Sequence, residues 1–172
     1  MKRSLSVLAA AVLLVGAMPR PVESDTGLRA TVGPRPIPLP AVGRYHCHDL
    51  DRPIIRCFRA PAGRDRQVTR RLATGFGTSP GADTMLLDYY VTFYEHASYG
   101  GASYTTSGGL TNLADIGWND VVSSFKSLNG LRPRWWEDAG YAGTAFMWSA
   151  GAQVSYVGDS ANDRFSSVKK YP

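Results

Sequence analysis

The second half of the chain is built from short apolar runs that glycine interrupts. From residue 86 onward, aromatic and β-branched residues alternate with polar ones in short runs, such as 89–94, 102–106, 144–148 and 153–157. This texture is typical of β-strands, and no helical period is sustained over the region. The eighty-seven residues of 86–172 suffice for a small β-sandwich of about eight strands.

The start of the chain has the pattern of an export signal. A basic Met1-Lys2-Arg3 precedes thirteen mostly apolar residues, Leu5 to Ala17, which end in small side chains. A membrane helix needs roughly 20 residues, so this run is too short to span a bilayer comfortably. We predict a cleaved signal peptide within residues 1–24, cut between residues 17 and 24, and a secreted protein without a membrane span.

The residues between signal and sandwich show weaker patterns. Residues 25–43 are rich in proline and predict a linker or surface arm. Residues 44–85 predict a small Arg-rich segment, in which 44–58 form a hairpin and 64–73 form one or two helical turns. The stretch 74–84 is rich in Gly, Ser and Pro and predicts a second linker.

Two cysteines, Cys47 and Cys57, are the only ones in the chain. In an oxidising compartment an isolated pair most simply forms a disulfide, worth roughly 2–3 kcal/mol for a loop of this size. A metal site in the run Tyr45-His46-Cys47-His48-Asp49 is the alternative. It lacks a second ligand cluster, and adjacent residues seldom converge on one ion.

The net charge of +5 is unevenly distributed. Residues 44–71 carry eight arginines against three aspartates, whereas residues 86–172 carry six basic and eight acidic side chains. Such a basic block can meet anionic cell-wall polymers, lipid surfaces or nucleic acid, or can be a solvated face. We favour the solvated face and expect no nucleic-acid partner.

An internal repeat organises the second half. The frame aromatic-Glu-x-Ala-x-Tyr-x-Gly occurs at 94–101 and returns forty-two positions later at 136–143. The hexapeptide N-D-x-x-S-S occurs at 119–124 and returns at 162–167. Two frames in the same order and nearly the same spacing define a first unit, residues 88–129, and a second unit, residues 131–172.

The spacing within each frame predicts a hairpin folded back over the sheet. Its two aromatic rings stack on each other, the following glycine takes a positive φ, and the last serine of the hexapeptide hydrogen-bonds the hairpin. The residues in these roles are Tyr94, Tyr99, Gly101 and Ser124 in the first unit, and Trp136, Tyr141, Gly143 and Ser167 in the second. Two such units, each a four-stranded Greek key, can pack as one sandwich.

These repeated frames resemble the βγ-crystallin family, in its microbial calcium-binding type with two Greek-key motifs. The family signature and its calcium sequence, Asn/Asp-Asn/Asp-x-x-Ser/Thr-Ser, are each met twice, over about residues 88–171. The resemblance implies an all-β, βγ-crystallin-like sandwich, with calcium as the cofactor in paired sites clamped by both motifs. The ligands it implies are Glu95, Asn119, Asp120, Val121 and Ser123, and Glu137, Asn162, Asp163, Arg164 and Ser166.

Two points bear on the calcium hypothesis. A single N-D-x-x-S-S could simply form Asx and serine turns at strand ends, but two copies inside two such frames favour calcium. Arg164 is a cation inside a loop meant for a cation. It occupies a variable position, and we expect its side chain to point outward.

The sequence indicates a protein without enzymatic activity. His96 lies in the first hairpin with Asp138 as its counterpart in the second unit, yet no nucleophile elbow, metal-binding histidine pair or phosphate loop accompanies it. Tryptophans that could line a sugar site are explained by core packing. A secreted calcium-binding structural protein, monomeric, is the favoured function.

The alternative is a protein that acts on an extracellular protein or a cell-surface target. By resemblance, this would be a metalloproteinase inhibitor or an antimicrobial, killer-type toxin on the same fold. Such small proteins usually carry more disulfides, and residues 86–172 contain no cysteine. The lack of disulfides in this half favours the calcium-binding hypothesis, in which the bound ion supplies the stabilising link that a disulfide would otherwise provide.

Overall fold

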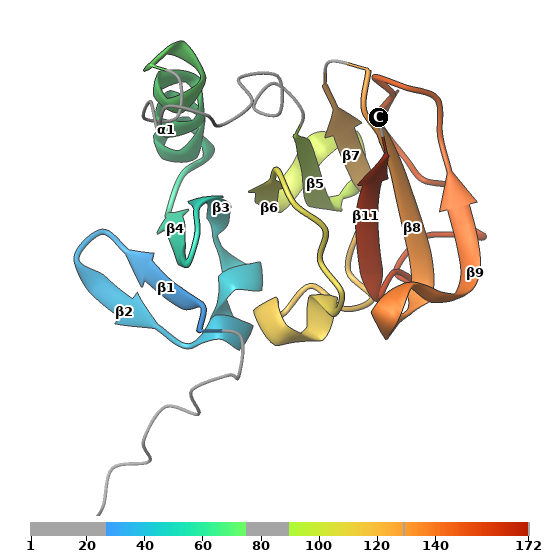
Figure 1. Cartoon of the computed structure of the whole chain (residues 1–172), viewed down its shortest axis with the longest axis horizontal. Coiled ribbons are helices and arrows are strands. Elements are labelled where there is room, and N and C mark those ends of the chain that lie inside the picture. Colours follow the sequence, from blue (N-terminus) through green and yellow to red (C-terminus); the bar gives the residue numbers. More distant parts are fainter. Residues whose placement is uncertain (1–26, 75–89, 129, 172) are drawn as a thin grey trace, which may run out of the picture.

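The computed structural model describes residues 27–74, 90–128 and 130–171. The predicted signal peptide at 1–24 and most of the predicted linker at 74–84 lie outside the described residues. The described strands form an eight-stranded sheet, ordered β10-β7-β5-β6-β3-β4-β1-β2, and a three-stranded sheet, ordered β11-β8-β9 (Figure 1). The all-β class and the crystallin-like sandwich are therefore confirmed.

The N-terminal segment, residues 27–74, is more ordered than its sequence indicated. Its elements are β1 (Arg29–Val32), β2 (Arg35–Ile37), a 3-10 helix (Leu39–Arg44), β3 (His46–Asp51), β4 (Ile54–Phe58) and α1 (Pro61–Thr74). The expected linker at 25–43 thus contains a β-hairpin formed by β1 and β2. Strand β1 also pairs in parallel with β4, and Ala30 is buried there. Pro36 is accommodated since β2 is the edge strand of the sheet.

Helix α1 is also longer than the one or two turns expected. It runs for 14 residues from Pro61, and proline suits the first turn because its missing N–H has no helical partner there. Buried Val68 and Arg64 anchor its inner side. No helix among the described residues has the length and apolar character needed to cross a membrane.

The predicted disulfide is confirmed. Cys47 and Cys57 lie opposite each other in the antiparallel β3–β4 pair, are bonded to each other, and are almost completely buried. The alternative metal site at residues 45–49 is therefore wrong, because its thiolate is consumed in the bond. Within the described ranges, no group of three His, Cys, Asp or Glu side chains is arranged to hold a metal ion.

The second half of the chain folds as two interlocked Greek keys. Its strands are β5 (Val91–His96), β6 (Gly100–Thr106), β7 (Ser124–Ser127), β8 (Arg132–Asp138), β9 (Ala142–Met147), β10 (Gln153–Val154) and β11 (Ser167–Tyr171). Short 3-10 helices occupy Ala97–Tyr99, Leu113–Ile116 and Ala139–Tyr141. The units exchange strands, because β10 of the second pairs with β7 of the first, and Leu110 of the first bridges to Val168 of β11.

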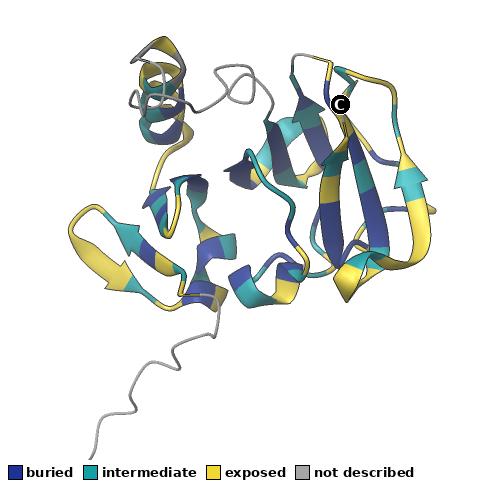
Figure 2. Cartoon of the chain, viewed as in Figure 1, coloured by how far each residue is buried: buried dark blue, intermediate teal, exposed yellow. Residues whose placement is uncertain are grey.

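Aromatic side chains fill the space between the two sheets. The ring of Phe93 contacts Trp118 at 4.8 Å and Trp135 at 5.4 Å between centroids, both edge-on, and Trp135 stacks on Phe165 at 5.0 Å. All four side chains are fully buried, and the strands on both sides of this core carry many buried positions (Figure 2). Edge-to-face and stacked contacts of this kind add stability beyond the area that they bury.

The N-terminal segment shares this core and its sheet. Strand β3 pairs in parallel with β6, so Cys47 lies opposite Tyr104. Val42 and Ile55 belong to the same buried cluster as the aromatic residues of the sandwich. The expected disulfide-closed hairpin therefore extends the first Greek key.

Candidate metal centre

Each folded hairpin has the geometry expected from its frame. The rings of Tyr94 and Tyr99 lie 5.5 Å apart between centroids, and those of Trp136 and Tyr141 lie 5.1 Å apart. Gly101 has a φ of +72°, and a Cβ there would lie 2.8 Å from a carboxylate oxygen of Glu95. The corresponding glycine of the second hairpin has a φ of +74°. These positions therefore require glycine both for conformation and for space.

The last serine of each hexapeptide holds its hairpin in place. Ser124 Oγ donates to the carbonyl of His96 at 2.6 Å and accepts the amide of Tyr99 at 3.1 Å. Ser167 repeats this with the carbonyl of Asp138 at 2.7 Å and the amide of Tyr141 at 3.1 Å. Both serines are fully buried, so these bonds satisfy groups that water cannot reach.

The two hexapeptide loops lie side by side and are linked reciprocally. The amide of Asp120 donates to the carbonyl of Phe165 at 3.0 Å, and the amide of Asp163 donates to that of Val122 at 3.5 Å. Both aspartates have a left-handed backbone, with φ of 53° and 54°. Within each loop the Asn side-chain amide donates to the neighbouring Asp carboxylate, at 2.6 Å from Asn119 and 2.7 Å in the second loop.

The first loop brings two of its candidate ligands together. Ser123 Oγ donates to the carbonyl oxygen of Glu95 at 2.8 Å, so a hydroxyl and a carbonyl from distant segments meet. The Glu95 carboxylate is engaged elsewhere, because Oε2 accepts the amide of Ala102 at 3.0 Å. The carbonyl of Glu95 is therefore better placed than its carboxylate to face the loop. Val121 packs against the core cluster through its side chain.

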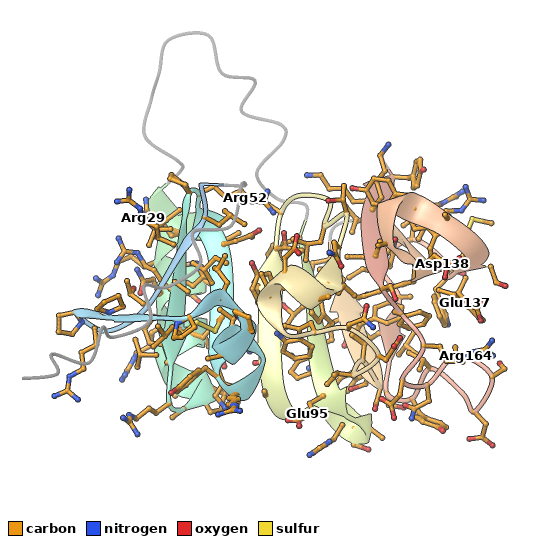
Figure 3. The ribbon with its side chains drawn as sticks, turned by 90° about the horizontal axis from the view of Figure 1, so that it is seen from below. Arg29, Arg52, Glu95, Glu137, Asp138 and Arg164 are labelled. Atoms are coloured by element: carbon orange, nitrogen blue, oxygen red, sulfur yellow. A yellow bond between two sulfur atoms is a disulfide. The ribbon has the colours of Figure 1, made fainter. Side chains whose placement is uncertain are left out.

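In the second loop the arrangement differs at one residue. The amide of Ser166 donates to the carbonyl of Trp136 at 2.9 Å, which brings this loop beside Glu137. The Arg164 side chain is half-exposed, yet its guanidinium turns back to form an ion pair with Oε1 of Glu137 (Figure 3). The Arg164 side chain is exposed, as expected, but the ion pair keeps its charge beside the second loop.

Oxygen atoms that lack a hydrogen-bond partner indicate whether the two loops could bind a hard cation such as calcium. Asn162 Oδ1 is buried and has no hydrogen-bond partner, and an unsatisfied buried acceptor costs about 1–3 kcal/mol. Carbonyl, hydroxyl and amide oxygens are ligands that calcium accepts, whereas zinc prefers sulfur and nitrogen. The donor set around the two loops therefore suits calcium.

The sequence did not reveal a buried polar group that joins the N-terminal segment to the first unit. Asp49 Oδ2 accepts hydrogen bonds from Arg52 at 2.8 Å and from Thr106 of β6 at 2.9 Å, while burial raises the pKa of Asp49. His48 is fully buried without a hydrogen-bond partner, and desolvation lowers its pKa from 6.5 to about 4. His96, by contrast, is exposed on its hairpin.

Solved structures similar to this chain are βγ-crystallin domains. No family model and no curated protein matches the chain. A double mutant of a βγ-crystallin domain from Clostridium beijerinckii is 38% identical over 48% of this chain and 96% of that one, with a TM-score of 0.43. A clostrillin double mutant in complex with nickel is 32% identical over 48% and 98%, with a TM-score of 0.44.

An archaeal βγ-crystallin is 29% identical over 48% of this chain and 98% of that one, with a TM-score of 0.42. The matched share of this chain is close to the length of the two repeated units. Identity of 38% over nearly the whole of a clostridial domain, together with both repeated signatures, shows the family. Through its second half, this chain belongs to the βγ-crystallin family.

Proposed function

We propose that this chain is an exported, non-enzymatic calcium-binding protein in which the ion stabilises the crystallin domain. One observation carries the proposal: the two N-D-x-x-S-S loops exchange hydrogen bonds between Asp120 and Phe165 and between Asp163 and Val122. Neither loop alone is long enough to enclose an ion that needs six to eight oxygens. Side by side, they can each contribute to both sites.

The residues that would hold calcium are oxygen donors of the loops and hairpins. Ser123, with the carbonyl of Glu95, would contribute in the first unit, and Ser166 and Asn162 would contribute in the second. Bound calcium would supply a fixed positive charge that ties each loop to its hairpin. Outside the cell, where calcium is abundant, such a tie would act throughout the life of the protein.

The ion would contribute a measurable share of stability. Extracellular calcium modules typically have dissociation constants of about 10⁻⁴ to 10⁻³ M. At free calcium of about 100 times that constant, binding to the folded state adds roughly 2.7 kcal/mol to the free energy of unfolding. This is a large fraction of the stability of a small domain.

Calorimetric titration of calcium into the chelator-treated protein tests the proposal. We expect heat of binding in the submillimolar to millimolar range, and weaker binding in Ser123→Ala and Ser166→Ala, because each loses a ligand oxygen. Ser124→Ala and Ser167→Ala are matched controls from neighbouring positions. They should lower stability in chelator while removing no ligand. A wild-type protein that gives no heat at millimolar calcium would show that the hexapeptides are only turns.

A further inference from the structure

The two calcium loops differ in charge at one equivalent position. Val121 follows the Asn-Asp pair of the first loop, and Arg164 follows that of the second. The Arg164 guanidinium forms an ion pair with Oε1 of Glu137, and it also donates to the carbonyl of Ser160 at 2.7 Å. A positive charge is therefore already tied to the carboxylate beside the second loop.

The first loop has no such cation. Glu95, the counterpart of Glu137, uses its carboxylate within its own hairpin and forms no ion pair among the described residues. In the second unit, Oε1 of Glu137 is buried, and its ion pair with Arg164 is the contact that compensates its charge. The same sequence frame thus presents two carboxylates without a cation in the first unit, and two carboxylates with one guanidinium in the second.

We propose that Arg164 is an intramolecular cation that competes with calcium at the second loop, so that the two sites are unequal. The inference rests on the proposed calcium function and specifies which site is filled first. Calcium at the second loop must approach a guanidinium of like charge or displace it from Glu137, and either event costs free energy. Calcium at the first loop meets neither cost.

The ion pair also has a consequence without calcium. Because Arg164 ties the second loop to β8 through Glu137, this loop keeps an electrostatic tie when the ion is absent. The first loop is tied to its hairpin strand by hydrogen bonds, such as those from Ser123 to the carbonyls of Glu95 and Tyr94, and by no ion pair among the described residues. The order of the second loop should therefore depend less on calcium than that of the first.

Calorimetric titration of four proteins tests the inference, with each variant first checked for cooperative unfolding. Arg164→Gln removes the charge at similar length and should tighten the weaker site about fivefold, the upper range for a partly exposed ion pair. Arg164→Lys keeps the charge and should leave that site weak. Val121→Arg transfers the cation to the first loop and should weaken the tighter site by a similar factor.

The outcomes separate this inference from the proposal beneath it. Two unequal sites in the wild type that become more nearly equal in Arg164→Gln support the inference. Two sites with the same constants in wild type and Arg164→Gln overturn it and leave calcium binding intact. Binding in Arg164→Gln but not in wild type also supports the competition. Absence of binding in all four proteins rejects calcium binding itself, and the inference with it.

Discussion

The two Greek keys carry the same sequence frame but have different surroundings. In the first, the outer edge of β6 is covered by β3, and Arg64 of α1 lies 5.8 Å from the ring centroid of Tyr94. In the second, β9 is the edge strand of its sheet, and most of its side chains are exposed (Figure 2). The Trp136 ring of the second hairpin is covered instead by Arg134 of β8, whose guanidinium carbon lies 5.6 Å from the ring centroid.

This difference separates features that one unit determines by itself from features that depend on distant segments of the chain. The hairpins are alike because their stacked rings, glycine and serine all lie within one unit. The edges differ because a segment from elsewhere in the chain covers one of them. An exposed edge of uncharged residues such as β9 is a place where another strand can pair, whereas β6 is already protected by the chain itself.

Removing the N-terminal segment should cause the largest change in the stability of the first unit. A fragment that begins near Asp83 should still fold, because both Greek keys lie beyond that point. It should lose at least about 3 kcal/mol of unfolding free energy, since Val42, Cys47 and Ile55 leave the shared core. Urea unfolding of fragment and whole chain measures this. Equal stabilities would show that the segment is merely appended, and an insoluble fragment would show that it completes the core.

Acidification should destabilise the contact between the N-terminal segment and the first Greek key, where His48 and Asp49 lie beside β6. Burial lowers the pKa of His48 from 6.5 to about 4, so between these values the unfolded chain binds a proton that the folded chain does not. Stability should therefore fall as pH falls through this window, by up to about 3 kcal/mol, and the raised pKa of Asp49 partly offsets the loss.

His48→Leu is the control for that pH dependence, because it places an apolar side chain of similar size in the buried position and removes the titration. Its stability should decline less steeply between pH 6.5 and 4 than that of the wild type, as measured by urea unfolding across the range. Since His48 lies opposite Thr105 of β6, amide exchange should also accelerate in β6 before β9. Identical pH slopes in the two proteins would contradict the assignment to His48.

Truncating the hairpin serines should have smaller and equal effects. Ser124→Ala and Ser167→Ala each leave a buried carbonyl and a hairpin amide without a partner, which costs about 1–3 kcal/mol. Thermal unfolding in chelator measures both. Because the local geometry repeats, we expect the two losses to agree within about 1 kcal/mol. A much smaller loss in the first unit would mean that the N-terminal segment holds that hairpin independently.

Much of the crystallin half could be predicted from sequence, because its signals are local. An aromatic residue, a tyrosine and a glycine within eight positions define each hairpin, and repetition gives the pairing of the units. The cysteines sufficed for the disulfide because no other partner exists in the chain. These features need no knowledge of the rest of the molecule.

The missed features depend on distant partners. Strand β1 buries Ala30 only because β4 lies beside it, so residues 29–32 show little pattern of their own. The join of β3 to β6 is likewise invisible in either strand alone. The ion pair of Arg164 likewise depends on Glu137 of β8, which is distant from it in the sequence.

Thermal unfolding of the wild type in chelator and in millimolar calcium tests the central claim most directly. If the paired loops hold calcium, the melting temperature rises with calcium concentration. The rise then falls to near zero in the Ser123→Ala, Ser166→Ala double variant, while magnesium at the same concentration has a smaller effect, because it demands octahedral geometry. A melting temperature that is the same in chelator and in millimolar calcium would contradict the account.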